Sequence, residues 1–138
     1  MSLIGESYYS MYFCQSFHPN MTTEEAAKWR DLLIEFRNLL GKTPDLNGIL
    51  FLIGMQELGK GPLAFSKEEK QDLMHIALCR LLSYSGYYQL EGSDQDGWPH
   101  WRLLKPLPPL NMMSQENLMR SLIIRYFEEH TDFNHEDN

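Results

Sequence analysis

The chain is poor in cysteine. It has two cysteines in 138 residues, Cys14 and Cys79, and they form neither a C-x-x-C pair nor part of a larger framework. Small disulfide-stapled domains and zinc ribbons need several closely spaced cysteines, so both classes are excluded. We expect both thiols to be reduced, as is usual in the cytoplasm.

Long apolar runs are also missing. The longest, residues 49–53, is far shorter than the roughly 20 residues with which a helix crosses a bilayer. The first residues contain no basic segment followed by an apolar one, which a secretory signal would need. We therefore expect no membrane partner and a cytoplasmic location.

Catalytic signatures are lacking as well. The sequence has no G-x-S-x-G, no H-E-x-x-H and no dinucleotide-binding glycine pattern. A stretch from Gly54 to Gly61 approaches a phosphate-binding loop, but it carries glycine where a hydroxyl must bind magnesium. These absences favour a protein without catalysis of its own and without a cofactor.

The C-terminal segment lacks basic residues. Residues 128–138 hold five acidic side chains, so the net charge of −7 falls to −2 for residues 1–127. A chain of this length predicts one domain. We expect a single helical domain with a hairpin over residues 1–127, followed by an acidic, frayed tail over residues 128–138.

Helical patterns occupy most of the chain. Apolar spacing predicts helices over residues 3–16, from Thr22 to about Leu40, over 44–58, from Ser66 to about Tyr84, and after Ser114. Thr22-x-x-Glu25 and Ser66-x-x-Glu69 are capping-box patterns. The helix over residues 44–58 is apolar nearly all round, which is typical of a buried helix. Its Gly48 and Gly54 suggest close approach of a neighbouring helix.

Two aromatic-rich strands follow the fourth predicted helix. They surround Gly92–Gly97 and predict one β-hairpin over residues 87–104. The fold class expected is therefore mainly α, with about five helices packed round the central helix 44–58 plus the hairpin. Residues 105–110 (Lys-Pro-Leu-Pro-Pro-Leu) predict an extended linker; they contain P-x-x-P, but a linker needs no partner.

The order of elements over residues 44–104 resembles that of a winged helix. That resemblance implies a DNA-binding regulator, which we keep as a third functional alternative. The charges of this segment argue against binding of nucleic acid, because binding to the phosphates needs exposed lysine and arginine side chains. The wing tip is acidic, and the helix before it carries equal numbers of both signs: Lys67, Lys70 and Arg80 against Glu68, Glu69 and Asp72.

Asp72, His75 and Cys79 share one stripe of the fourth predicted helix. Carboxylate, imidazole and thiol are zinc or iron ligands, and His100 would complete a set of four if the hairpin folds over the helix. Glu57 beside His75 or His100 would form an acid–base pair. A small enzyme, with or without a metal, that uses Glu57, Asp72, His75 and His100 is thus the alternative function. A hydrogen-bonded histidine and an ion-paired Glu57 explain the same residues without catalysis.

Aromatic side chains gather on the hairpin. They either pack within the fold or form a recognition surface. With catalytic signatures absent, the leading interpretation is a small protein that binds another protein or itself, with a homodimer as the default. The candidate binding residues are Tyr87, Tyr88, Trp98, His100 and Trp101.

Overall fold

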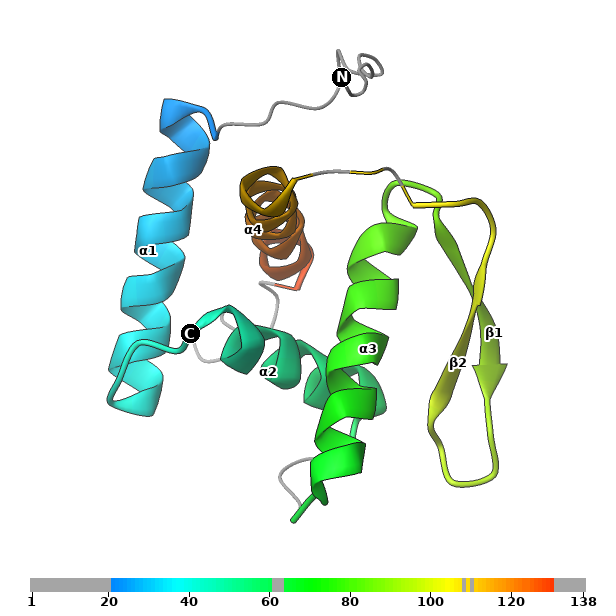
Figure 1. Ribbon diagram of the computed structural model, residues 1–138. Helices are drawn as coiled ribbons and strands as arrows, with labels where there is room; N and C mark the ends of the chain where they lie inside the picture. Colours follow the sequence, from blue (N-terminus) through cyan, green and yellow to red (C-terminus); the bar gives the residue numbers. More distant parts are fainter. Residues whose placement is uncertain (1–20, 61–63, 108, 110, 131–138) are drawn as a thin grey trace. The chain divides into compact units, whose positions relative to one another are not determined.

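The computed structural model describes residues 21–60, 64–107, 109 and 111–130. Over these residues the chain is mainly helical with one hairpin, which confirms the expected fold class. The elements are shown in Figure 1, and their bounds are α1 Thr23–Leu40, α2 Leu46–Leu58, α3 Lys67–Ser83, β1 Tyr88–Ser93, β2 Pro99–Leu103 and α4 Met112–Glu129.

The described residues contain four helices, whereas the sequence predicted about five. The remaining one, over residues 3–16, lies outside the described residues. The start of the acidic segment differs from the frayed tail expected over residues 128–138, because α4 continues through Glu128 and Glu129. Residues 131–138 are not described, so the frayed tail stays a prediction.

Internal contacts divide the chain into two units. One unit, residues 1–35 with 107–138, contains most of α1 and all of α4. The other, residues 36–106, contains α2, α3 and the hairpin. We call them the α1–α4 unit and the α2–α3–hairpin unit, and describe each by itself. The expected single domain over residues 1–127 remains a prediction.

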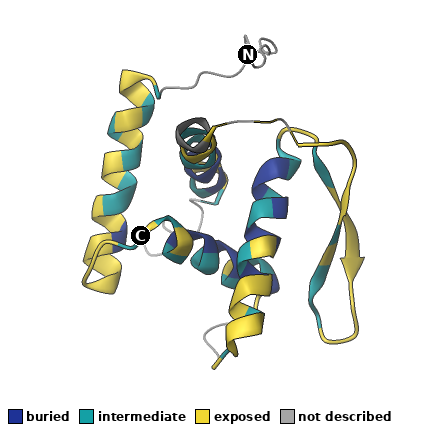
Figure 2. Ribbon diagram, in the orientation of Figure 1, coloured by how far each residue is buried: buried dark blue, intermediate teal, exposed yellow. Residues whose placement is uncertain are grey.

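Helix α2 is the most buried helix of its unit, as its sequence predicts (Figure 2). It starts because the Asp45 carboxylate accepts a hydrogen bond from the Gly48 N–H at 2.8 Å. It ends at Gly59, whose left-handed backbone, with φ of 74°, is easy only for glycine. Within it, Ile49 and Ile53 are completely buried.

Helix α3 begins with the predicted capping box. The Glu69 N–H donates to the Ser66 hydroxyl at 3.1 Å, and the Ser66 N–H donates to the Glu69 carboxylate at 2.9 Å. The helix packs across α2 at Gly54, where an added Cβ would come within 2.2 Å of the Leu73 carbonyl oxygen. The close approach predicted from Gly54 is therefore confirmed. At Gly48 the tight neighbours are instead Asp45 and Pro44 in the start of the same helix.

The core of this unit joins both helices to the hairpin. Leu58, Leu73 and Ile76 form its buried centre. The Phe65 ring meets Trp98 of the hairpin edge-on, with centroids 6.5 Å apart. Partly buried apolar side chains surround this centre, namely Phe51, Met55, Phe65 and Trp98.

The hairpin is antiparallel and carries one bulge. Leu90 pairs with Trp101 and Gly92 pairs with His100, so Glu91 is an extra residue in β1. The Leu104 N–H donates to the Tyr87 carbonyl at 2.8 Å, and the Asp94 N–H donates to the Trp98 carbonyl at 3.0 Å. Figure 1 shows the two strands running alongside α3, which contacts both of them.

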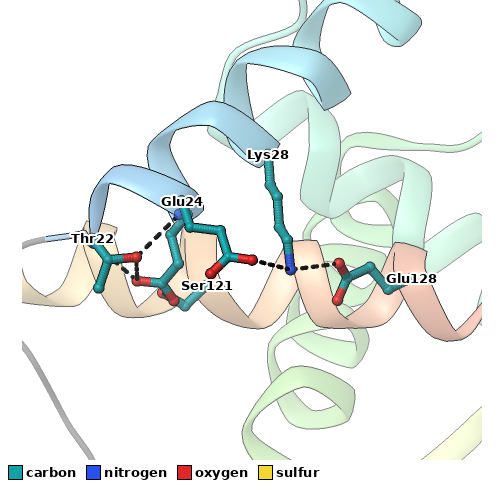
Figure 3. A network of polar contacts seen from close by, with 6 residues as sticks. Thr22, Glu24, Lys28, Ser121 and Glu128 are labelled. Atoms are coloured by element: carbon teal, nitrogen blue, oxygen red, sulfur yellow. Dashed lines mark hydrogen bonds and ion pairs between the residues drawn. The ribbon is translucent and has the colours of Figure 1, made fainter.

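The α1–α4 unit is tied together by polar contacts (Figure 3). The Ser121 hydroxyl of α4 donates to the Glu25 carboxylate at 2.9 Å, and Glu25 also closes the predicted capping box with Thr22. The Lys28 ammonium lies 3.0 Å from the Glu128 carboxylate, and this contact raises the pKa of Lys28. The buried residues of α4 are Leu122, Ile123, Ile124 and Tyr126.

Candidate functional site

The side of α3 that meets the hairpin contains two of the residues that the sequence singled out, His75 and Cys79. His75 and Cys79 are four residues apart, so they lie on one face of the helix. The His75 Nε2 atom is 3.5 Å from the Cys79 Sγ atom. The Tyr88 ring of β1 meets the His75 ring edge-on, with centroids 6.4 Å apart. His75 and Cys79, two of the three residues of the predicted stripe, thus contact a strand of the hairpin.

Cys79 is a buried, protonated thiol in this arrangement. It is completely buried, and burial raises the pKa of its thiol to about 11, although a hydrogen bond with Tyr88 partly opposes that rise. Burial also raises the pKa of Tyr88, with a smaller contribution from Cys79. Because the thiolate is the nucleophilic form, Cys79 is a weak nucleophile at neutral pH.

The other predicted metal ligands do not join this pair. Asp72 is exposed on α3, and His100 is exposed on β2. Among the described residues, no three His, Cys, Asp or Glu side chains lie together as metal ligands would. The four-ligand arrangement therefore does not form, because the hairpin places Tyr88 rather than His100 over Cys79.

His100 belongs to the hairpin turn. Its Nε2 atom lies 3.0 Å from the Asp94 Oδ2 atom. The other oxygen of Asp94 accepts hydrogen bonds from the N–H groups of Asp96 and Trp98. These contacts, of which the one with His100 is the largest, lower the pKa of Asp94. Asp94 is therefore the residue that organises the turn.

Glu57 lies at the end of α2 and forms an ion pair with α3. Its Oε1 atom is 3.8 Å from the Arg80 Nε atom, and both side chains are partly buried. That separation exceeds a hydrogen bond, so the buried Arg80 Nε atom has no hydrogen-bond partner. Glu57 thus pairs with an arginine, and the acid–base group expected from Glu57, His75 and His100 is not assembled.

The aromatic candidates of the hairpin are half-buried. Trp98 packs on Phe65, Tyr88 packs on α3, and Tyr87 lies under the Lys105 ammonium at 4.6 Å from its ring centroid. Burial raises the pKa of Tyr87. Trp101 is also half-buried, and only His100 of the five predicted binding residues is exposed. Most of the aromatic surface therefore contributes to packing within the unit.

Sequence reasoning missed the leucines of the hairpin. Leu90 and Leu103 are 51% and 50% exposed. Both belong to the side of the hairpin that also holds Tyr88 and Trp101, because residues two apart in a strand point the same way. Alternation in the sequence separates the two faces of the hairpin but does not say which one α3 covers, and only the position of α3 reveals how much of each leucine stays uncovered.

Lys60 fixes the tip of the hairpin to the end of α2. Its ammonium donates to the Asp96 carbonyl oxygen, and an added Cβ at Gly97 would lie 3.3 Å from the Lys60 Cε atom. No pattern in the sequence signals this contact, because the two residues are 36 positions apart.

Comparisons with known proteins add no relative: no family model, no curated protein and no solved structure matches this chain. Within the described part of the chain, no helix has both the length and the apolar character needed to cross a membrane.

Proposed function

We propose that this chain is a protein-interaction module that self-associates through the apolar face of its hairpin. That face consists of Tyr88, Leu90, Trp101 and Leu103, which the strand register places on one side. The observation that supports the proposal is the half exposure of its two leucines, Leu90 and Leu103.

Helix α3 covers only part of this face. The helix contacts the Tyr88 ring through His75, whereas Leu90 and Leu103 each keep about half of their surface in water. Burying apolar surface stabilises an interface by about 25 cal/mol for each Å² removed from water. Neighbouring exposed apolar side chains are typical of interaction sites.

The strand edges are poorly suited to pairing with a further strand. Along an antiparallel strand, the backbone groups of successive residues point alternately towards the partner strand and away from it. Trp98 and Leu104 bond to the β1 side of the hairpin, so the backbone of Pro99 points away from β1, towards the free edge. Proline has no N–H to offer there. The other strand carries the bulge at Glu91, which also disfavours edge pairing. The face of the hairpin, rather than its edge, is the binding surface proposed.

The charges around this face suit a second copy of the chain. The whole chain has a net charge of −7, but the hairpin holds charges of both signs. Glu91 and Arg102 form an ion pair at 3.8 Å within one copy. Two hairpins can therefore meet with little repulsion, as a symmetric, self-complementary interface requires.

The test is the molar mass in solution, measured by light scattering over a range of concentrations. The wild type should shift towards a dimer as concentration rises. The variant L90Q/L103Q should remain monomeric with an unchanged circular dichroism spectrum, while the control L39Q/L40Q, which alters two exposed leucines of α1, should dimerise normally.

A wild type that stays monomeric throughout the range would overturn the self-association proposal. Dimers that persist in L90Q/L103Q would show that another surface mediates assembly and would contradict the role of the hairpin face.

A further inference from the structure

We infer that His75 of α3 lies at the border of the self-association surface, and that uptake of a proton by its imidazole weakens the association of two copies. This inference rests on the proposed function, since it names the regulation of the same apolar face. His75 is not itself a member of that face. It is the side chain beside the face on which a charge can appear at mildly acidic pH.

Two contacts fix the position of His75 next to the face. Its ring meets the Tyr88 ring edge-on, with centroids 6.4 Å apart. Its Nε2 atom lies 3.5 Å from the Sγ atom of Cys79, about one turn further along α3. Tyr88 pairs directly with Leu103 across the hairpin, and Leu103 is half exposed. A second copy that covers Leu103 therefore also removes water from the neighbourhood of His75.

The loss of water matters because it acts on one protonation state only. His75 is exposed in the single copy, so water solvates its imidazolium form. Histidine ordinarily changes its charge between pH 5 and pH 8. Removal of water from a histidine disfavours the charged form. A proton that binds better to the single copy than to the pair shifts the equilibrium towards the single copy, because the coupling between the two binding events is reciprocal.

The ionisable neighbours of His75 within α3 and α2 leave this effect in place. Asp72, about one turn earlier on α3, is exposed and acts on His75 in the single copy as well as in the pair, so its influence largely cancels. The pKa of Cys79 is raised to about 11, which keeps its thiol neutral. Glu57 is the ionisable residue of α2, and it forms its ion pair with Arg80.

The charged side chains of the two strands are engaged with each other or with the turn. Arg102 pairs with Glu91, and His100 pairs with Asp94. The hairpin meets His75 through Tyr88, and burial raises the pKa of that phenol, so it stays neutral. Uptake of a proton by His100 strengthens its contact with the Asp94 carboxylate and so favours the folded turn. The effect of His100 is therefore opposite in sign to the one inferred for His75.

The experiment measures the dissociation constant of the dimer by light scattering over a range of concentrations, at about pH 7.5 and about pH 5.5 in the same salt. The wild type should associate about tenfold more weakly at the lower pH. The variant H75Q, which stays polar but cannot gain a charge, should associate equally at both pH values. The control H130Q, which removes the histidine that follows α4 in the other unit, should keep the response of the wild type. Circular dichroism at both pH values checks that each protein stays folded.

A dimer with the same dissociation constant at both pH values would contradict this inference and leave the self-association proposal standing. A pH response that H75Q retains would assign the proton to another group and would equally contradict it. Tighter association at the lower pH would show that His100 dominates, against the role of His75. A wild type that is monomeric at both pH values would remove the self-association proposal and this inference with it.

Discussion

At the scale of single residues, packing explains both Gly54, which has no side chain, and Cys79, whose side chain is buried. Gly54 is a weak helix former inside α2, and the reason for it is the Leu73 backbone of α3 directly opposite. Cys79 fills space between α3 and Tyr88 without being exposed to water.

Replacing Gly54 with alanine should destabilise the protein by about 1–3 kcal/mol, the range for overpacked cores. The gain in helix propensity, about 1 kcal/mol, is outweighed because the Leu73 carbonyl is backbone and cannot move aside. Urea unfolding gives the value. The control is G48A, which should change stability less. The Cβ that it adds would lie 3.2 Å from the Asp45 Oδ1 atom, which belongs to a side chain. Equal stability of G54A and the wild type would contradict the close packing of α2 on α3.

The Cys79 thiol should react slowly with a thiol reagent in the folded protein. A pKa of about 11 leaves little thiolate at pH 8, and burial blocks access. In a C14S background, labelling with Ellman's reagent should be slow until urea unfolds the chain. Fast labelling without denaturant would show that α3 and Tyr88 do not shield the thiol. Because burial raises the folded pKa of Cys79 from the ordinary value of 9.0 to about 11, the contribution of this thiol to stability is fully present below pH 9 and is lost as the pH rises towards 11.

At the scale of elements, the hairpin depends on its turn. A two-stranded hairpin is marginal by itself, so its stability comes from the turn, from α3 and from Lys60 at the tip. Asp94 accepts hydrogen bonds from Asp96 and Trp98 and contacts His100, so one carboxylate holds both ends of the turn.

Replacing Asp94 with alanine should loosen the hairpin and lower the stability of the protein. D96A is the matched control, because Asp96 contacts Lys60 and Asp94 through its backbone carbonyl and N–H. Trp98 packs on Phe65, so its indole NMR signal reports the change. The pKa of Asp94 is lowered on folding, so its contribution is present above pH 3.8 and is lost as the pH falls below that value. If D94A and D96A behave alike, the carboxylate of Asp94 does not organise the turn.

At the scale of the whole molecule, the distribution of charge decides which partners suit the chain. The net charge is −7, and the hairpin tip carries Glu91, Asp94 and Asp96. Duplex DNA repels such a surface, since non-specific binding depends on lysine and arginine neutralising phosphates.

We therefore predict that the chain does not bind duplex DNA, even at low salt. A mobility-shift titration checks this, with the charge-reversed variant E91K/D96K as a comparison that should bind more strongly. Binding of the wild type that weakens steeply with salt, and that is lost in K67A/K70A/R80A, would instead support a winged-helix-like regulator.

The parts of this protein that the sequence by itself determined are local. Ser66 with Glu69, and Thr22 with Glu25, form their capping boxes because each bond spans three residues and needs no distant partner. His75 and Cys79 were placed on one face by helical spacing alone, and they do meet.

Tertiary structure decided the rest, because it depends on which distant residues meet. Spacing put Asp72 on the same stripe, but the register of the hairpin against α3 brought Tyr88 to Cys79 and left Asp72 exposed and His100 beside Asp94. The same register determined that Leu90 and Leu103 keep half their surface uncovered. Such pairings are set by packing shape over long sequence separations, and the hydrophobic pattern fixes which face is buried without specifying its neighbour.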